Sequence, residues 1–324
     1  MDSQYIFENI NVYNEIEVDC FQNLLLSYLQ LFHADTNYLK ICWPWTFERH
    51  FVEKNAKRYM ILNQHESISL QRISDIYHNK GRQVYFDENA DRASVLEEYL
   101  KQYQAVFLCI DEYYIGYHYK HVFEKQHGLH TLLVTNIDME QKVVQGISSI
   151  PVFKGNIPLD YFEKALYSPE IKEWFVYFES NKFETNPISS YKESMKKEFA
   201  LEKSSDNIIY TKDIITHLKG IDFHDSDIEY LCEGTWGWKI TAKGEMLIDF
   251  IEKEKPFNQK QSEIIEDIKN INLNWSKGYK LLFKFSCSKH EIFFKRAIEY
   301  IERAYETECQ LQNTIFESID GEEK

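Results

Sequence analysis

Residues 14–32 read NEIEVDCFQNLLLSYLQLF, and this stretch decides the fold because it holds the first clear helix of the chain. Asp19 is a suitable N-cap, and the leucines and aromatics after Cys20 recur at helical spacing. This pattern predicts a helix over residues 20–32 with a wide buried face. The thiol of Cys20 then lies on the first turn, where the helix dipole and the unpaired N–H groups favour a thiolate. With a base nearby, such a thiolate is a nucleophile.

A candidate base lies in residues 126–138, QHGLHTLLVTNID. Here His130 opens an apolar strand predicted over residues 129–137, which a polar turn connects to a return strand over 143–150. Strand alternation puts His130 on one face with Leu132 and Val134, and we expect this face to lie against the helix of Cys20. His130 is therefore the expected base, and His127 is the alternative. Each of these residues also has an ordinary structural interpretation, as a buried thiol or a histidine at a strand end.

Three pieces of the sequence together resemble the N-terminal domain of the butirosin biosynthesis protein H family. They are the start of the Cys20 helix, the apolar strand that ends in DEYY at residues 111–114, and the run QHGLHTLLV at 126–134. The resemblance covers residues 1–155. It implies a papain-like, C39-related cysteine fold that moves an acyl group from a carrier protein to an amine through a cysteine thioester. On this resemblance Cys20 is the nucleophile and His130 is the base.

The third catalytic residue stays open. The family usually has an acid on the return strand, where this sequence has Gly146. Other residues could orient the histidine, and we consider Asn136, Asp138, Asp111 and Gln145. Asn14, just upstream of the cysteine, is the candidate for the oxyanion hole, a place that a side-chain amide takes in papain-like enzymes. Without an orienting group, the chain would have only a Cys–His dyad or would have lost activity.

The composition excludes several classes of function. With 37 Lys and Arg against 52 Asp and Glu, the net charge of −15 argues against binding of nucleic acid. It also removes electrostatic steering toward an acidic carrier protein. There is no signal-peptide pattern and no apolar run of the ~20 residues that a membrane helix needs. The six cysteines have no metal-ligand spacing, and no glycine-rich phosphate loop is present. We therefore expect a soluble, cytoplasmic protein without metal or cofactor.

The pattern of elements predicts an α+β protein with two domains. We expect a papain-like α/β domain over residues 1–155 that holds Cys20 and His130, a mostly helical domain over 156–317, and a charged tail over 318–324. In the first domain the sequence predicts an extended arm at 1–13, helices at 67–77 and 91–103, and strands at 83–86 and 105–110. In the second it predicts helices at 159–167, 170–179, 189–201, 211–219, 241–253, 259–270 and 290–312.

These expectations combine into a cysteine-dependent acyl transfer or thioester cleavage. The acyl donor would be of the carrier-protein or CoA type, and the resemblance implies bacterial secondary-metabolite or nonribosomal peptide biosynthesis. Two alternatives stay open: a non-catalytic scaffold or binding protein of the same pathway, and a peptidase or amidase that acts on a small amide. The sequence leaves the donor, the acceptor and the oligomeric state open.

Overall fold

The computed structural model describes residues 2–14, 20–37, 47–54, 57–64, 70–87, 89–116, 123–170, 174–184, 208–209, 211–220 and 236–320. Asp19 and the helix predicted at 189–201 lie outside these ranges. The chain divides into two compact units. The first unit is residues 1–36 with 70–186, and the second is residues 37–69 with 187–324. This division differs from the boundary expected at residue 155, because the strands of the first sheet continue to residue 178.

The first unit is built on a six-stranded antiparallel sheet in the order β3-β8-β4-β5-β6-β7. Its strands are β3 (Gly81–Tyr85), β4 (Val106–Asp111), β5 (Leu129–Asp138), β6 (Val143–Ser149), β7 (Val152–Pro158) and β8 (Trp174–Phe178). The α+β class is thereby confirmed, as are the hairpin of β5 and β6 and the buried strand β4. The helix predicted at 170–179 is wrong: its WFVYF core is strand β8, because aromatic and β-branched residues suit a pleated surface better than a helix.

Among the described residues of the first unit, five helices accompany this sheet. They are α1 (Ser3–Asn9), α2 (Cys20–Leu31), α3 (Leu70–Tyr77), α4 (Arg92–Tyr103) and α5 (Leu159–Leu166). The predicted helix at Cys20 is confirmed, and the side chain of Asp91 caps α4 as expected by accepting from the Ser94 N–H. The arm predicted at residues 1–13 is wrong for its first part. Residues 3–9 are helical, with the Asp2 side chain accepting from the Tyr5 N–H at the start.

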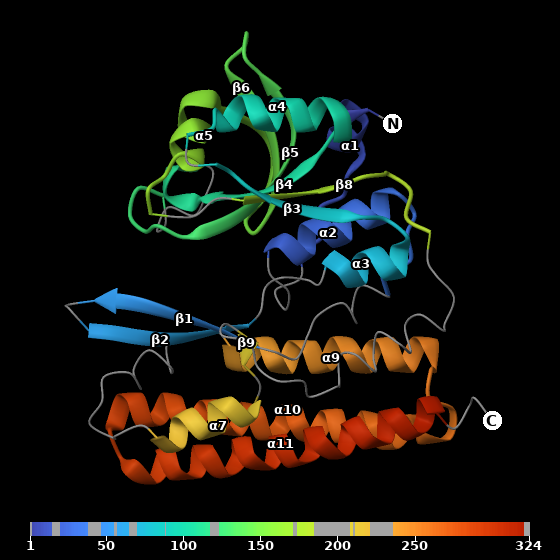
Figure 1. The fold of residues 1–324 in the computed structure, drawn as a ribbon, viewed down its shortest axis with the longest axis vertical. Coiled ribbons are helices and arrows are strands. Elements are labelled where there is room, and N and C mark those ends of the chain that lie inside the picture. Colours follow the sequence, from blue (N-terminus) through green and yellow to red (C-terminus); the bar gives the residue numbers. More distant parts are fainter. Residues whose placement is uncertain are drawn as a thin grey trace. The chain divides into compact units, whose positions relative to one another are not determined.

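Helices cover both faces of the sheet (Figure 1). On one face, α4 and α5 enclose an apolar core to which the sheet contributes Leu108, Ile110 and Leu132. On the other face lies α2, where the rings of Phe21 and Tyr28 have their centroids 5.4 and 5.3 Å from that of Phe107. The alternation of side chains along each strand therefore decides which helix a residue meets.

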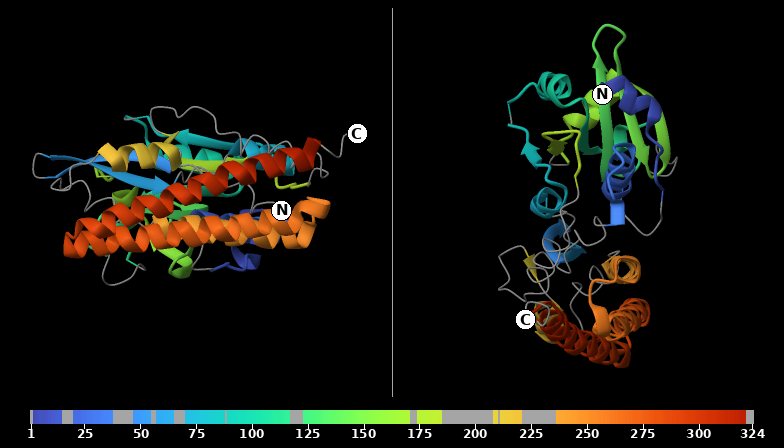
Figure 2. Two further views of the ribbon diagram at one scale, coloured as in Figure 1. Left: turned by 90° about the horizontal axis from the view of Figure 1, so that it is seen from below. Right: turned by 90° about the vertical axis from the view of Figure 1, so that its right-hand side faces the viewer.

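The second unit combines a small sheet with long helices. The sheet has the order β2-β1-β9, and the elements are β1 (Phe47–Lys54), β2 (Lys57–Gln64), β9 (Ile208–Ile209), α7 (Thr211–Gly220), α9 (Trp236–Glu254), α10 (Gln261–Ser288) and α11 (Glu291–Asp320). Helices α10 and α11 form an antiparallel hairpin (Figure 2). They approach closely at Gly278, where a Cβ would lie 2.8 Å from Ile301 Cγ1.

The helices of the second unit are longer than the sequence predicted. The helix expected at 290–312 continues to Asp320, so part of the expected charged tail is helical. In the described part of the chain, no helix combines the length and the apolar character needed to cross a membrane.

Candidate functional site

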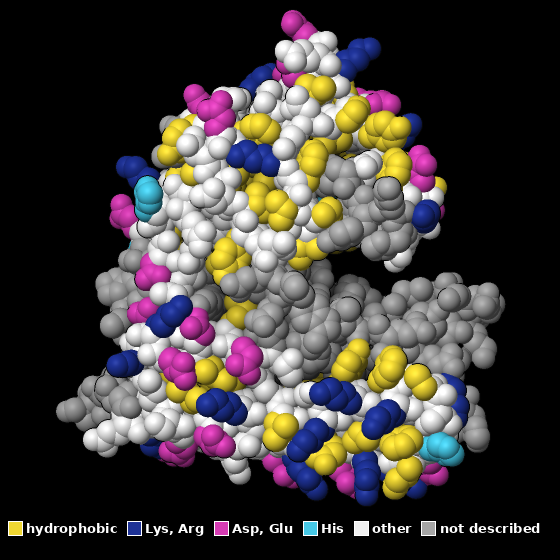
Figure 3. All heavy atoms as spheres, turned by 180° about the vertical axis from the view of Figure 1, so that it is seen from behind, with side chains coloured by type: hydrophobic (Ala, Val, Ile, Leu, Met, Phe, Trp, Pro, Cys, Tyr) yellow, Lys and Arg dark blue, Asp and Glu magenta, His cyan; other side chains and the backbone are white. Residues whose placement is uncertain are grey.

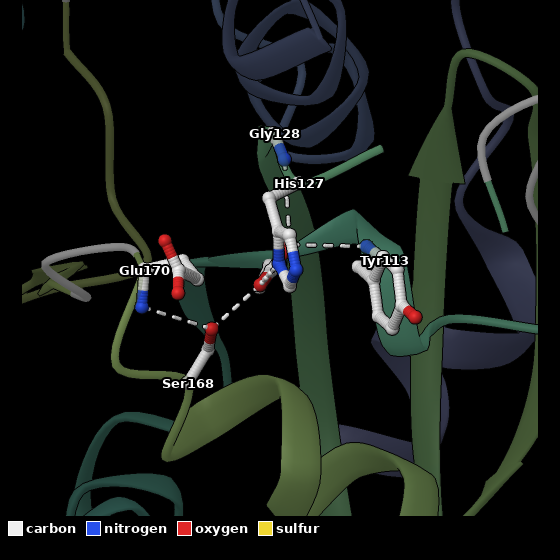
Figure 4. Close-up of polar contacts among 6 residues, drawn as sticks. Tyr113, His127, Gly128, Ser168 and Glu170 are labelled. Atoms are coloured by element: carbon white, nitrogen blue, oxygen red, sulfur yellow. Dashed lines mark hydrogen bonds and ion pairs between the residues drawn. The ribbon is translucent and has the colours of Figure 1, made fainter. Parts of the chain in front are cut away.

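A buried carboxylate organises the end of strand β4 (Figure 4). Asp111 is fully buried, and both of its oxygens accept hydrogen bonds. Oδ2 lies 2.6 Å from His127 Nδ1 and 2.6 Å from Ser168 Oγ. Oδ1 accepts from the backbone N–H groups of Tyr113 at 3.0 Å and Gly128 at 3.3 Å. The carboxylate therefore connects the loops that follow β4 and α5 to the loop that precedes β5.

The charge of Asp111 is stabilised by these contacts. Burial raises the pKa of the Asp111 carboxyl, but the hydrogen bonds from Ser168, His127 and the two backbone N–H groups together outweigh burial, and the pKa is lowered. Burial and the nearby charge of Asp111 instead raise the pKa of Glu112. Asp111 is thus an ionised acceptor. Its bond to His127 Nδ1 requires the proton on that nitrogen, so in the neutral form of the ring the lone pair is on Nε2.

The imidazole of His127 is held in place and is open to solvent. Its ring stacks on that of Tyr113, with centroids 4.2 Å apart and planes inclined by 7°. The side chain is 37% exposed. Within the described part of the chain, Nε2 makes no hydrogen bond. A partly exposed histidine with Nδ1 on a buried carboxylate and no hydrogen bond on Nε2 among the described residues has the arrangement of a general base.

Gly128 allows this loop to close. The Glu112 N–H donates to the Gly128 carbonyl at 2.9 Å, and a Cβ on Gly128 would collide with the carboxylate of Glu112. Glycine is therefore the residue that lets the segment before β5 pass so close to the turn after β4. This close approach brings His127 to Asp111.

Helix α2 points its first turn toward the same end of the sheet. Near its start, the ring of Phe21 contacts Trp174, and Trp174 pairs with Cys109 of β4. Further along α2, Tyr28 stacks on Phe178 at the other end of β8. Because β8 runs antiparallel to β4, α2 also runs antiparallel to β4, and its N-terminus lies toward the end of β4 that carries the acid.

The strand register also shows which side chains lie on the same face of the sheet. Alternation along β4 puts Phe107, Cys109 and Asp111 on one face, and Phe107 contacts α2. The Ser149 hydroxyl donates to the carbonyl of Cys20 at 3.1 Å, which ties the first turn of α2 to strand β6. Cys20 and Asp111 therefore belong to the same face and the same end of the sheet.

His130 belongs to the other face. It pairs with Ile110, which lies in the core under α4 and α5, and it is only 4% exposed. Its Nε2 lies 2.8 Å from Ser148 Oγ. The sequence led us to expect that His130 would face the helix of Cys20, and the structure differs, because that face of β5 lies against α4 and α5. These surroundings are those of a structural histidine.

Two orienting candidates lie far from either histidine. Asn136 and Asp138 stand six and eight residues beyond His130 along β5, about 20 and 27 Å away at the rise of a strand. Asp138 instead caps the hairpin, since Oδ1 accepts from the N–H groups of Glu140 and Gln141. Asp111, the candidate from the preceding strand, is the one that binds a histidine.

Position 146 could not hold an acid in this fold. A Cβ on Gly146 would lie 2.9 Å from Ile157 Cδ1 and 3.0 Å from Leu132 Cδ1, and both side chains belong to the apolar core under α4 and α5. A carboxylate there would be buried without a partner. The neighbouring Gln145 alternates to the other face of β6, pairs with Asn136 and is thus also remote from His127.

Asn14 is exposed, and the residue before it contacts the middle of α2. The Tyr13 N–H donates to Ser27 Oγ at 2.7 Å, and Ser27 lies about two turns, or ~10 Å, from Cys20. The segment that returns from Asn14 to Cys20 lies outside the described residues. The proposed oxyanion role of Asn14 therefore stays a prediction.

No protein-family model matches the chain, and no curated protein is significantly similar to it in sequence. Across the described residues, no cluster of three or more His, Cys, Asp or Glu side chains is arranged to hold a metal ion. The chemistry of the site thus rests on Cys20, His127 and Asp111 themselves.

Proposed function

We propose that the first unit is a papain-like cysteine acyltransferase or thioester-cleaving domain, with Cys20 as nucleophile and His127 as base. The observation that carries this proposal is the 2.6 Å contact between His127 and Asp111, at the face and end of the sheet where α2 begins. A thiol on the first turn of a helix and a carboxylate-oriented imidazole are the two parts that a cysteine acyl-transfer site needs.

In the proposed reaction, His127 Nε2 takes the proton of the Cys20 thiol. The thiolate attacks the carbonyl carbon of an acyl thioester, and a bond forms between the Cys20 sulfur and that carbon. The tetrahedral intermediate collapses by breaking the bond to the donor sulfur, which leaves as a thiol with the proton from His127. The nitrogen of an amine or the oxygen of water then bonds to the acyl carbon and gives a proton to His127. The bond between that carbon and the Cys20 sulfur breaks, and His127 returns the proton to the Cys20 thiolate. Asp111 stabilises the imidazolium in each half-reaction.

The thioester donor, of carrier-protein or CoA type, is suggested by the resemblance of residues 111–114 and 126–134 to the butirosin biosynthesis protein H family. The alternative that the protein is a non-catalytic scaffold rests on the absence of an acid at Gly146. Asp111 beside His127 weakens that argument, because it supplies an orienting carboxylate from another strand. Ser168 does not compete as a nucleophile, since its hydroxyl donates to the carboxylate and not to the imidazole.

The test is acylation of the protein. The protein is incubated with acetyl-pantetheine in the absence of an amine, and intact-mass and peptide mass spectrometry locate the acetyl group. We expect one acetyl group on Cys20, lost in Cys20→Ala and kept in Cys287→Ala, which removes an exposed thiol of the second unit. Acetylation that survives Cys20→Ala, or none at all with acyl-pantetheine donors of several chain lengths, contradicts the proposal.

A further inference from the structure

One face of helix α10 carries a row of lysines beside exposed apolar side chains. Leu273, Lys277, Lys280 and Lys284 follow one another at intervals of three or four residues, so they form one stripe on the side of α10 away from its core. Phe283 flanks this stripe. We name these five residues the α10 basic face. Figure 3 shows Lys and Arg side chains intermingled with hydrophobic ones on the helical part of the chain.

The basic character of this surface departs from the rest of the chain. Residues 273–298 contain six Lys and Arg and a single acid, Glu291, whereas the whole chain has 37 basic and 52 acidic residues. This local excess of positive charge creates a positive electrostatic potential on an otherwise acidic protein. Solubility alone does not explain it, because the acidic residues already give the chain a large net charge.

The lysines of the α10 basic face form no salt bridge in the described part of the chain. Within the described part of the chain, Lys277, Lys280 and Lys284 have no carboxylate partner, although Lys219, Lys253, Lys260 and Lys295 do. Lys277 instead lies over the ring of Tyr300 in α11, with Nζ 5.5 Å from the ring centroid. Arg303 lies over the same ring at 5.3 Å. The aromatic ring between two cations extends the surface onto α11.

The apolar members are exposed at both ends of the row. Leu273 is 50% and Phe283 is 55% exposed. They lie ten residues apart, about 15 Å along the helix axis. Leu273 begins the row and Phe283 lies beside its other end, so a partner laid along the row would gain apolar contacts from these two side chains, and the lysines would fix its register.

We propose that the α10 basic face binds an acidic amphipathic helix of a partner protein. The carboxylates of that helix would contact Lys277, Lys280 and Lys284, and its apolar side chains would contact Leu273 and Phe283. The row spans about three helical turns, which matches a helix laid along α10. This inference goes beyond the chemistry proposed for Cys20 and does not depend on it.

A protein partner fits better than nucleic acid or an anionic membrane. Both of those present negative charge over a long distance, and the remainder of this acidic chain would repel them. A compact acidic helix meets only the local field, because solution salt screens charges beyond about 8 Å. The exposed Leu273 and Phe283 also require apolar surface on the partner, which a phosphate backbone does not offer.

The test uses a capped, fluorescently labelled peptide with glutamates on one face of a helix and leucines beside them. Binding to the full-length protein is followed by fluorescence anisotropy. We expect saturable binding that weakens when salt rises from about 0.05 M to about 0.3 M. The variant K277E/K280E/K284E should bind at least about tenfold more weakly, and Phe283→Ala about threefold to tenfold more weakly. The matched control K142E/K182E/K212E changes the net charge equally at exposed lysines elsewhere and should bind within about twofold of the wild type.

Four outcomes would overturn the inference. The peptide could fail to bind, or it could bind K277E/K280E/K284E as tightly as the wild type although circular dichroism shows the variant folded. Single-stranded DNA or vesicles of phosphatidylserine and phosphatidylcholine could bind the α10 basic face more tightly than the peptide does. The wild type could form a dimer that K277E/K280E/K284E abolishes, which would assign this face to a second copy of the chain.

Discussion

Replacing Asp111 should test the architecture of the site and its chemistry at once. Asp111 accepts from the Ser168 hydroxyl, His127 Nδ1 and two backbone N–H groups while fully buried. In Asp111→Ala these donors lose their acceptor. In Asp111→Asn the shape is kept, but one carboxylate oxygen becomes an NH₂ group that donates.

The expected loss of stability follows from these hydrogen bonds. A buried donor without an acceptor costs about 1–3 kcal/mol, and the costs of neighbouring donors are less than additive. We expect Asp111→Ala to lower the free energy of unfolding of the first unit by about 3–5 kcal/mol, and Asp111→Asn by about 1–2 kcal/mol. Because the pKa of Asp111 is lowered in the folded state, its contribution is complete above the unfolded value of about 3.9 and is lost as the pH falls through the folded value. The penalty in Asp111→Ala should therefore be constant between about pH 5 and 8 and should shrink in acid.

Two assays read the result. Native-state hydrogen exchange of the amides in β4 and β5 measures the opening of the first unit alone. Nitrogen-15 NMR of the histidine side chains reads the tautomer, and in Asp111→Asn we expect the proton of His127 to move from Nδ1 to Nε2, since the new NH₂ group donates to Nδ1. A destabilisation below about 1 kcal/mol in Asp111→Ala, or an unchanged tautomer in Asp111→Asn, would refute the reasoning.

Two further predictions concern the cores of the two units. Gly146→Ala should destabilise the first unit by about 1–3 kcal/mol, because its Cβ meets Leu132 and Ile157, whereas Gly220→Ala, with open space around its Cβ, should show no such clash. Gly146→Asp should unfold the unit and should not complete a catalytic triad. Urea titration combined with hydrogen exchange measures the stability of all three variants. In the second unit, burial raises the pKa of Glu308 to about 7, against hydrogen bonds from Trp275 and Thr211 that lower it. The folded state then holds a proton that the unfolded state loses near pH 4.3, so stability falls as the pH rises from there to about 7. Glu308→Gln should therefore stabilise the second unit by on the order of 1–3 kcal/mol at pH 8 and have no effect at pH 4, as thermal melts at both pH values would show; equal effects at both would contradict this assignment.

Much of the first unit could be predicted from local pattern. The helix at Cys20, the strand before Asp111 and the hairpin after His130 each carry a period or a turn signal that depends on neighbouring residues alone. The strand at 174–178 was mistaken for a helix although its aromatic and β-branched residues suit a strand, and its pairing with β3 and β4 decides between the two.

The residues of the candidate site could be identified only from the register in which strands β4 and β5 pair. The sequence indicated both histidines and Asp111, but whether His127 or His130 meets the face under α2 depends on which residue of β5 pairs with which residue of β4. Pairing of Ile110 with His130 turns that imidazole toward α4 and α5 and leaves His127 at the strand end beside Asp111. Ser168, brought to the same carboxylate by the loop after α5, carried no sequence signal, because a lone serine before a proline is common in turns.

The central claim is that His127, and not His130, serves Cys20. Site-resolved mass spectrometry of iodoacetamide labelling, repeated from about pH 5 to 9, gives the pH midpoint of Cys20 alkylation, which for an ordinary thiol lies near 8.5. We predict a midpoint well below that value in the wild type, a return to about 8.5 in His127→Gln, and the wild-type midpoint in His130→Gln. An ordinary midpoint in the wild type, or a shift in His130→Gln with none in His127→Gln, would contradict the account.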